Sequence, residues 1–314
     1  MKKVKVAIIG HGHLGKWHAQ KADQLEKSEL VAIVEPNAES AKKIKETYSQ
    51  IKVVANIGDI IDEIDAAIVV TPTSVHFECV KQLLENKKHV FCEKPLCSTV
   101  EQTKSLEPLI KDRVLQVGHS ERCHQVWDIA RDQLKSMQSP RTIKIDRYAP
   151  FKGRATDVDV VQDLMIHDID LVKYLTGASF VKVKAKGHKI RTKHWDHVTA
   201  FFETELGDTV IITSGRNHTE EKRSLEIMSE QGCLYVDLFS NQYSFATDGQ
   251  FENGEFVKTN GYEKRDHLLV EQEYFYNSVL EGADVFVNYE DGAYAVKVVN
   301  DVLNSLETQS EVKI

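Results

Sequence analysis

The sequence predicts an α/β domain, built as a doubly wound parallel sheet, followed by an α+β domain with an open, mostly antiparallel sheet and helices on one face. A glycine-rich turn follows an apolar run near residue 10, and apolar runs alternate with helical stretches up to residue 118. Beyond residue 180, strand-like runs are separated by glycines. Alternation favours parallel βαβ units, whereas glycine-separated runs favour hairpins. We place the domains at residues 1–120 and 121–314.

The first segment has the order of a dinucleotide-binding unit. An apolar run at 6–9 precedes a glycine pattern, a helical stretch at 16–26 and a second apolar run at 30–34, which ends on Glu35. The acid lies about 20 residues after the last glycine, the spacing of a Rossmann dinucleotide site. The alternative is a glycine-rich turn in another doubly wound fold. The expected cofactor-binding residues here are Glu35 and the pattern Gly10, His11, Gly12, His13, Leu14 and Gly15.

Each glycine of this pattern has a physical reason. Gly10 lets the chain turn sharply out of the strand, Gly12 leaves room for a pyrophosphate, and Gly15 lets the helix pack close to the strand. The free N–H groups and the dipole of the helix start favour an anion. Glu35 accepts hydrogen bonds from the adenosine ribose and repels an extra phosphate, so NAD is favoured over NADP.

Strands and helices continue to alternate through the first domain. Strands are expected at 52–55, 66–70, 89–92 and 114–117, and helices at 38–49, 57–63, 75–85 and 99–110. Two loops, residues 71–76 and 93–96, leave the carboxyl ends of such strands, where doubly wound sheets bind ligands. Pro95 biases Lys94 away from helical geometry, so Lys94 can project into the crevice. The alternative is a solvated lysine before a proline that starts a helix.

The second domain is expected to contain one helix with a proton-handling pair. Asp163 and His167, in a predicted helix at 160–171, are four residues apart and so share a helix face. The carboxylate can hold the imidazole and raise its basicity. The alternative is a capping aspartate with a surface histidine. The other expected helices are at 121–137, 266–280 and 291–306, and the strands are at 141–148, 180–190, 197–204, 209–216, 224–229, 233–238 and 243–245.

Composition excludes several classes of function. The net charge of −8 argues against a broad nucleic-acid-binding face. No apolar run approaches the ~18 residues of a membrane span, and Lys5 interrupts the N-terminal run before a signal sequence develops. Five cysteines without a C-x-x-C pair argue against a disulfide framework and a zinc site. We therefore expect a cytoplasmic protein with no metal, no membrane and no nucleic-acid partner. An uncovered sheet face often meets a second subunit, which favours a homodimer or homotetramer.

Together, the glycine pattern, the Glu93-Lys94-Pro95 loop, the Asp163-x-x-x-His167 pair and the loop at 71–76 resemble the Gfo/Idh/MocA family of sugar oxidoreductases. The resemblance covers essentially the whole chain, with Thr73 where asparagine is common. It implies that Lys94 binds the reacting hydroxyl and stabilises the alkoxide, that His167 takes the proton, and that Asp163 orients His167 or a sugar hydroxyl. The residues that it places near the nicotinamide or its ribose are Thr71, Pro72, Thr73, His76 and Glu93.

The substrate is indicated by a narrower resemblance. Residues 118–122 and 150–170 look like a branch of the family that oxidises carbon 3 of UDP-N-acetylglucosamine. The sequence departs from this branch at Cys123-His124-Gln125. Arg122, Tyr148 and Arg154 are candidates to bind a diphosphate or a sugar, and the alternative is surface charge and a core tyrosine. The competing functions are oxidation of a free polyol such as inositol and a regulator that binds the cofactor without turnover.

Overall fold

The computed structural model describes residues 2–153, 158–247 and 257–314, which form two compact units. Unit 1 comprises Met1–Ser120 and Asp266–Val296, and unit 2 comprises Glu121–Arg265 and Lys297–Ile314. Residues 266–296 thus group with unit 1, and the expected domains at 1–120 and 121–314 stay a prediction. Among the described residues, no helix is both long enough and apolar enough to cross a bilayer.

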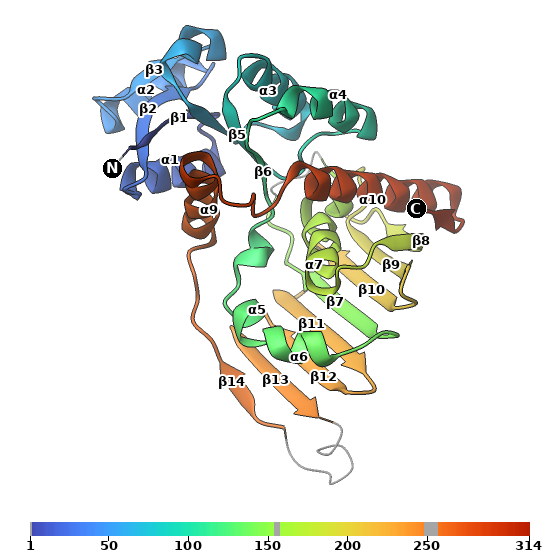
Figure 1. Cartoon of the computed structure of the whole chain (residues 1–314). Coiled ribbons are helices and arrows are strands. Elements are labelled where there is room, and N and C mark those ends of the chain that lie inside the picture. The colour runs from blue at the N-terminus through green and yellow to red at the C-terminus, as the bar shows by residue number, and fades with distance from the viewer. Residues whose placement is uncertain (1, 154–157, 248–256) are drawn as a thin grey trace. The chain divides into compact units, whose positions relative to one another are not determined.

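Unit 1 is organised around a six-stranded parallel sheet of order β3-β2-β1-β4-β5-β6 (Figure 1). The order reverses between β1 and β4, which in doubly wound sheets marks the ligand-binding crevice at the carboxyl ends of the strands. The predicted parallel fold is thus confirmed. The strands are β1 (Val4–Ile9), β2 (Ser28–Val34), β3 (Lys52–Val54), β4 (Ala66–Val69), β5 (His89–Glu93) and β6 (Leu115–Gly118).

Helices cover both faces of this sheet, each with its own buried cluster. Helices α3 and α4 contribute to one cluster, and α1, α2 and α9 contribute to the other. Phe275 and Tyr276 of α9 are fully buried in unit 1, and each such side chain contributes roughly 2–3 kcal/mol. This burial explains why residues 266–296 join unit 1. The helices are α1 (His13–Gln24), α2 (Ala38–Thr47), α3 (Thr73–Glu85), α4 (Val100–Ile110), α9 (His267–Glu281) and α10 (Tyr289–Thr308), whose last part belongs to unit 2.

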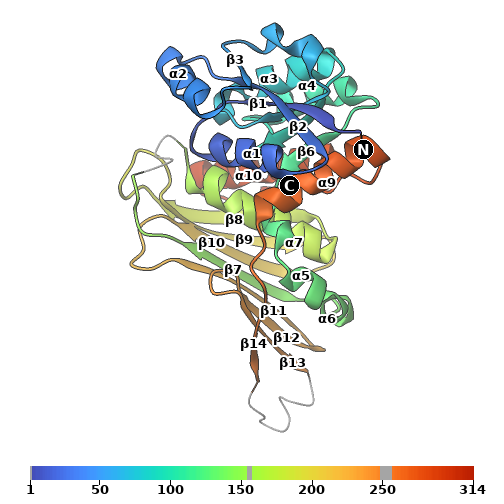
Figure 2. The same cartoon turned by 90° about the vertical axis from the view of Figure 1, so that its left-hand side faces the viewer.

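Unit 2 contains a nine-stranded sheet of order β14-β13-β12-β11-β7-β10-β9-β8-β15. Among the described strand pairs of this sheet, only β7 and β10 are parallel, which confirms a mostly antiparallel sheet. Helices α5, α6 and α7 lie along one face (Figures 1 and 2). The strands are β7 (Thr142–Tyr148), β8 (Phe180–His188), β9 (His197–Thr204), β10 (Thr209–Gly215), β11 (Lys222–Ser229), β12 (Gly232–Asp237), β13 (Gln242–Thr247), β14 (Thr259–Gly261) and β15 (Val312–Lys313).

Two expected helices of unit 2 are irregular. The stretch 121–137 is broken into a 3-10 turn (Ser120–Cys123), α5 (Val126–Ile129) and α6 (Arg131–Ser136). The Trp127 indole N–H donates to the Glu121 carbonyl at 2.8 Å, so a side chain occupies an acceptor that a continuous helix would use. The helix near residue 160 begins with a π-helical turn (Val161–Met165) and continues as α7 (Ile166–Thr176).

Candidate active site

The turn between β1 and α1 has the close packing that its glycines predict. Gly10 has a φ of +91°, in the region that disfavours other residues. A Cβ atom on Gly15 would lie 2.2 Å from the Gly10 carbonyl oxygen, whereas one on Gly12 would meet no described atom within 4 Å. The backbone at Gly12 is therefore open to a ligand, and the helix at Gly15 is pressed against the turn.

Glu35 lies beside this turn at the end of β2. Its carboxylate accepts hydrogen bonds from the backbone N–H groups of His11, at 3.4 Å, and Asn37, at 3.0 Å. The His11 ring meets Tyr48 edge to face at 5.8 Å, and its buried Nε2 atom has no hydrogen-bond partner among the described residues. The open backbone at Gly12, the carboxylate and this unpaired nitrogen fit the adenosine diphosphate part of NAD.

His76 connects the two loops that follow β4 and β5. Its Nδ1 lies 2.8 Å from the Pro95 carbonyl oxygen, and its Nε2 lies 2.9 Å from that of Thr71. Burial lowers the pKa of His76, although the two carbonyls and the charge of Glu93 act in the opposite direction. Both ring nitrogens are thus occupied within the protein. His76 therefore links the loops that carry Thr71 and Lys94, and its expected place near the nicotinamide stays a prediction.

Glu93 is buried beneath the backbone of Lys94. One carboxylate oxygen is 2.9 Å from His18 Nε2, and the other accepts the Lys94 backbone N–H at 3.2 Å. The Gln272 amide nitrogen lies 3.1 Å from His18 Nδ1, so both ring nitrogens of His18 have partners and its Nε2 faces Glu93. The Glu93 carboxylate therefore holds the backbone of Lys94 in place. Sequence reasoning missed His18 and Gln272, although His18 on the inward face of a helix was a visible signal.

The Glu93 carboxylate is expected to make unit 1 sensitive to acid. Burial opposes ionisation, but the hydrogen bond and charge of His18 and the charge of Lys94 outweigh it and hold the Glu93 pKa below 4.5. The resulting stabilisation is complete above about pH 4.5 and is lost as the pH falls further. Between pH 7 and pH 4, the melting temperature of Glu93→Gln should therefore fall less than that of the wild type. Each kcal/mol of stabilisation lost corresponds to roughly 2–4 °C in melting temperature. Thermal melts at both pH values measure this; exposed Glu107→Gln is the control, and equal losses in all three proteins would contradict it.

In unit 2, the expected pair lies at the irregular start of a helix. Asp163 is in the π-helical turn, where the Ile166 N–H donates to the Val161 carbonyl, and His167 is in the first turn of α7. Both side chains are partly buried. A separation of four residues places two side chains on one face only in a regular α-helix. Turns of the π-helical type occur often at functional sites.

The three expected substrate residues have different surroundings. Arg122 is buried, and its guanidinium donates to both carboxylate oxygens of Asp170, at 2.8 and 2.6 Å; its expected contact with a diphosphate or sugar stays a prediction. Tyr148 is stacked between the rings of His197 and His218, at 5.9 and 4.8 Å. Burial and the charge of Asp146 raise the Tyr148 pKa, so its hydroxyl stays protonated. Arg154 lies outside the described residues.

No metal site is found in the part of the chain that the structure describes. No group of three or more His, Cys, Asp or Glu side chains there is arranged to hold a metal ion.

A doubly wound domain with this glycine turn, followed by an α+β domain that carries an Asp/His pair, defines a dinucleotide-dependent oxidoreductase. Residues 4–119 match the model of the GFO/IDH/MocA oxidoreductase family with an NAD-binding Rossmann fold, and residues 138–235 match the GFO/IDH/MocA C-terminal domain. The chain belongs to the Gfo/Idh/MocA family and is an NAD-dependent oxidoreductase that acts on CH–OH groups. The expected family, class of enzyme and cofactor are confirmed.

Similar proteins include enzymes of sugars and polyols. UDP-N-acetylglucosamine 3-dehydrogenase from Acidithiobacillus ferrooxidans is 32% identical over 91% of this chain and 92% of the relative, and its solved structure aligns with a TM-score of 0.90 at 30% identity over 98% and 99% of the two chains. Myo-inositol 2-dehydrogenase from Thermotoga maritima is 24% identical over 99% of this chain and 98% of the relative. The structure of scyllo-inositol dehydrogenase from Lactobacillus casei with NAD(H) and scyllo-inositol aligns with a TM-score of 0.84 at 23% identity over 99% of both chains, which shows the fold alone.

Proposed function

We propose that the enzyme oxidises a ring hydroxyl of a nucleotide sugar, with carbon 3 of UDP-N-acetylglucosamine as the first candidate. NAD supplies the hydride acceptor. Lys94 donates a hydrogen bond to the reacting oxygen and stabilises its developing negative charge, His167 accepts the hydroxyl proton, and Asp163 orients His167 or a neighbouring sugar hydroxyl. The dinucleotide phosphates bind at the start of α1, and Glu35 binds the adenosine ribose. Tyr148 and Arg154 remain the proposed sugar or diphosphate contacts.

The observation that carries this proposal is the likeness, over nearly the whole chain, to UDP-N-acetylglucosamine 3-dehydrogenase from Acidithiobacillus ferrooxidans. Two features favour keeping a free polyol as the second candidate: the chain also matches inositol dehydrogenases over most of its length, and Arg122 is engaged by Asp170.

A substrate panel separates the two candidates. Reduction of NAD by the purified 314-residue chain is followed with UDP-N-acetylglucosamine, UDP-glucose, N-acetylglucosamine and myo-inositol. We expect turnover with UDP-N-acetylglucosamine and a product whose ketone is at carbon 3. Activity on myo-inositol alone would overturn the nucleotide-sugar proposal, and NAD binding without turnover of any sugar or polyol would favour a regulator.

Glu35 is expected to determine the choice between NAD and NADP. The wild type should bind NAD more tightly than NADP, because the 2′-phosphate would approach the Glu35 carboxylate. Glu35→Gln should narrow that preference on the order of 10-fold, since about 1.4 kcal/mol of repulsion corresponds to that factor. Titration of both dinucleotides by calorimetry measures it, with exposed Glu39→Gln of α2 as the control. Tighter NADP binding by the wild type would contradict the assignment.

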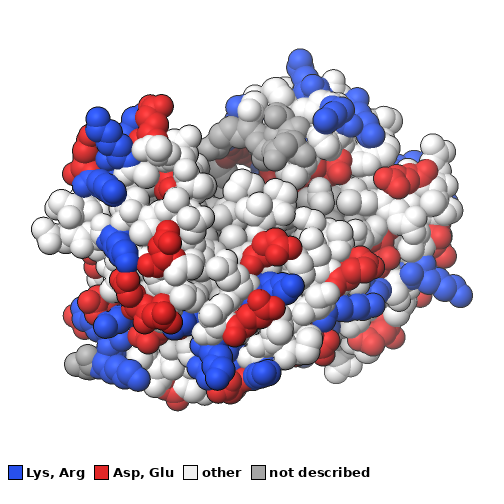
Figure 3. Space-filling model, turned by 90° about the horizontal axis from the view of Figure 1, so that it is seen from above, with Lys and Arg blue, Asp and Glu red and all other residues white. Residues whose placement is uncertain are grey.

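We also infer that the enzyme is a cytoplasmic homodimer or homotetramer without nucleic-acid or membrane partners. Its five cysteines, all described, are free thiols, which suits a reducing compartment. On the described part of the face in Figure 3, Lys and Arg are interspersed with Asp and Glu, and such a mixture does not favour binding of a polyanion such as a nucleic acid. Exposed Phe201 and Met228 on strands of the large sheet favour contact with a second copy. Native mass spectrometry tests this, and a monomer at micromolar concentration would refute it.

A further inference from the structure

A buried charge cluster in unit 2 joins α7 to the strand beneath it. Arg147 of β7 donates to Asp168 of α7 through Nε, at 2.9 and 3.1 Å, and through Nη2, at 2.6 Å. Its Nη1 donates to Glu121 at 3.1 Å. The side chains of Arg147, Asp168 and Glu121 are 4%, 0% and 5% exposed, so all three charges depend on one another for solvation.

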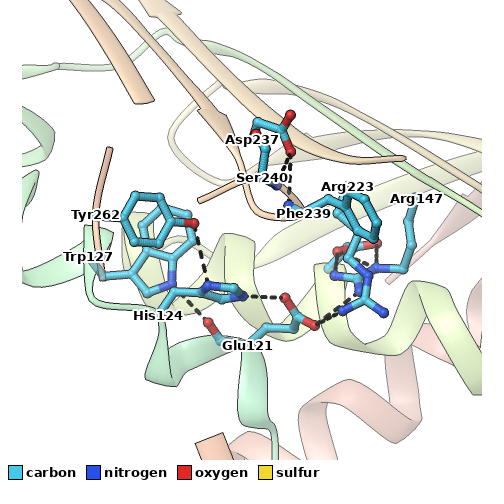
Figure 4. Close-up of polar contacts among 10 residues, drawn as sticks. Glu121, His124, Trp127, Arg147, Arg223, Asp237, Phe239, Ser240 and Tyr262 are labelled. Carbon is cyan, nitrogen blue, oxygen red and sulfur yellow. Dashed lines mark hydrogen bonds and ion pairs between the residues drawn. The ribbon is translucent and has the colours of Figure 1, made fainter. Parts of the chain in front are cut away.

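The cluster extends to the segment where the sequence departs from the related branch. Glu121 also contacts His124 Nε2 at 3.1 Å and Arg223 at 3.3 Å (Figure 4). The other nitrogen of His124 faces the Tyr262 hydroxyl at 3.5 Å. Four separate parts of unit 2 therefore meet around Glu121 and Arg147: the turn before α5, β7, β11 and α7.

The position of Asp168 gives this cluster a consequence for the reaction. Asp168 directly follows His167 in the first turn of α7. The preceding turn, Val161–Met165, is π-helical, so regular α-helical hydrogen bonds alone do not set the rotation of α7 about its axis. A guanidinium that donates to a carboxylate through two nitrogens restrains both the direction and the rotation of the helix that carries the carboxylate. Arg147 also directly precedes Tyr148, whose side chain, by strand alternation, lies on the opposite face of the sheet.

We propose that Arg147 is a positioning residue that, through Asp168, sets the orientation of His167 for proton transfer. The proposal rests on the proposed role of His167. Arg147 remains cationic because the charges of Asp168 and Glu121 outweigh the effect of burial and raise its pKa. A lysine at position 147 would keep the charge but lose the two-nitrogen grip.

The test compares Arg147→Lys with Arg141→Lys. Arg141 forms an equally buried pair with Asp208, through Nε at 3.1 Å and Nη2 at 2.7 Å, and it does not contact α7 through this pair. With UDP-N-acetylglucosamine and NAD, we expect Arg147→Lys to lower kcat by roughly 100-fold, the effect of a misplaced group, with an unchanged KM for NAD. The melting temperature of Arg141→Lys should fall by as much as that of Arg147→Lys, but its kcat should stay unchanged. Guanidinium ion should raise the kcat of Arg147→Ala and leave that of Arg141→Ala unchanged.

A second measurement needs no substrate. In protein labelled with ¹³C-histidine, the titration midpoint of His167, assigned by its loss in His167→Asn, should move in Arg147→Lys and not in Arg141→Lys. Equal kcat losses in the two lysine variants, or an unmoved midpoint, would overturn the positioning role. If His167→Asn keeps wild-type kcat, the proposed role of His167 fails and the positioning role fails with it. If His167→Asn is inactive while Arg147→Lys is fully active, only the positioning role fails.

Discussion

Replacing Lys94 with methionine is expected to lower kcat by about 10³-fold, the usual effect of removing one group that stabilises a developing oxyanion. Methionine keeps the length and apolar stem of the side chain but cannot donate a hydrogen bond. The loop should keep its shape, because Glu93 and His76 hold it through backbone atoms of Lys94 and Pro95. NAD affinity and melting temperature should therefore stay near those of the wild type.

Stopped-flow measurement of NADH formation, together with NAD titration, separates these effects for Lys94→Met. The matched control is Lys104→Met, which removes an exposed lysine from α4 of the same unit. A kcat within twofold of the wild type in Lys94→Met would remove the lysine from the mechanism. A parallel loss of NAD binding would instead assign it to the cofactor site.

Alanine at position 15 is expected to destabilise the fold, whereas alanine at position 12 is expected to weaken NAD binding. At Gly15 the new Cβ atom would lie 2.2 Å from the Gly10 carbonyl oxygen, so α1 must move away from the turn. Overpacking of this kind costs about 1–3 kcal/mol or more. We therefore expect Gly15→Ala to melt several degrees lower or to remain unfolded.

At Gly12 the same atom meets no described protein atom within 4 Å, so the fold should be unaffected. The methyl group would occupy the space in which a pyrophosphate approaches the backbone, and NAD affinity should fall by at least 10-fold. Differential scanning fluorimetry with and without NAD measures both variants. Unchanged NAD binding in Gly12→Ala would move the phosphates away from this turn, and a wild-type melting temperature in Gly15→Ala would contradict the packing argument.

Local patterns were enough to predict most of the framework. The six parallel strands of unit 1 and the main strands of unit 2 follow from apolar runs and from the glycines between them, since these signals act over a few residues. The glycine turn and Glu35 were predicted as a unit because their spacing in the chain is itself the signal. The two short strands β14 and β15 were missed, since two or three residues carry no period.

Contacts between distant residues were beyond the reach of such patterns. Nothing near Glu93 in the chain indicates that His18 will contact it or that Gln272 will contact His18. Helix α9 was expected in the second domain, and only the packing shows that its Phe275 and Tyr276 are buried in unit 1. The expected helix at 121–137 is broken near its start, where the Trp127 indole N–H donates to the Glu121 carbonyl and the Glu121 side chain pairs with Arg147 of β7.

The sequence by itself determined the class of fold, the dinucleotide turn and the residue types available for proton transfer, because each depends on chain-local geometry. Only the tertiary structure decided which charged groups are free for chemistry and which are consumed by folding. Arg122 is held by Asp170, and Arg147 by Asp168 and Glu121. A charge removed from water must find a partner, and that partner is chosen by the packing of segments far apart in the chain.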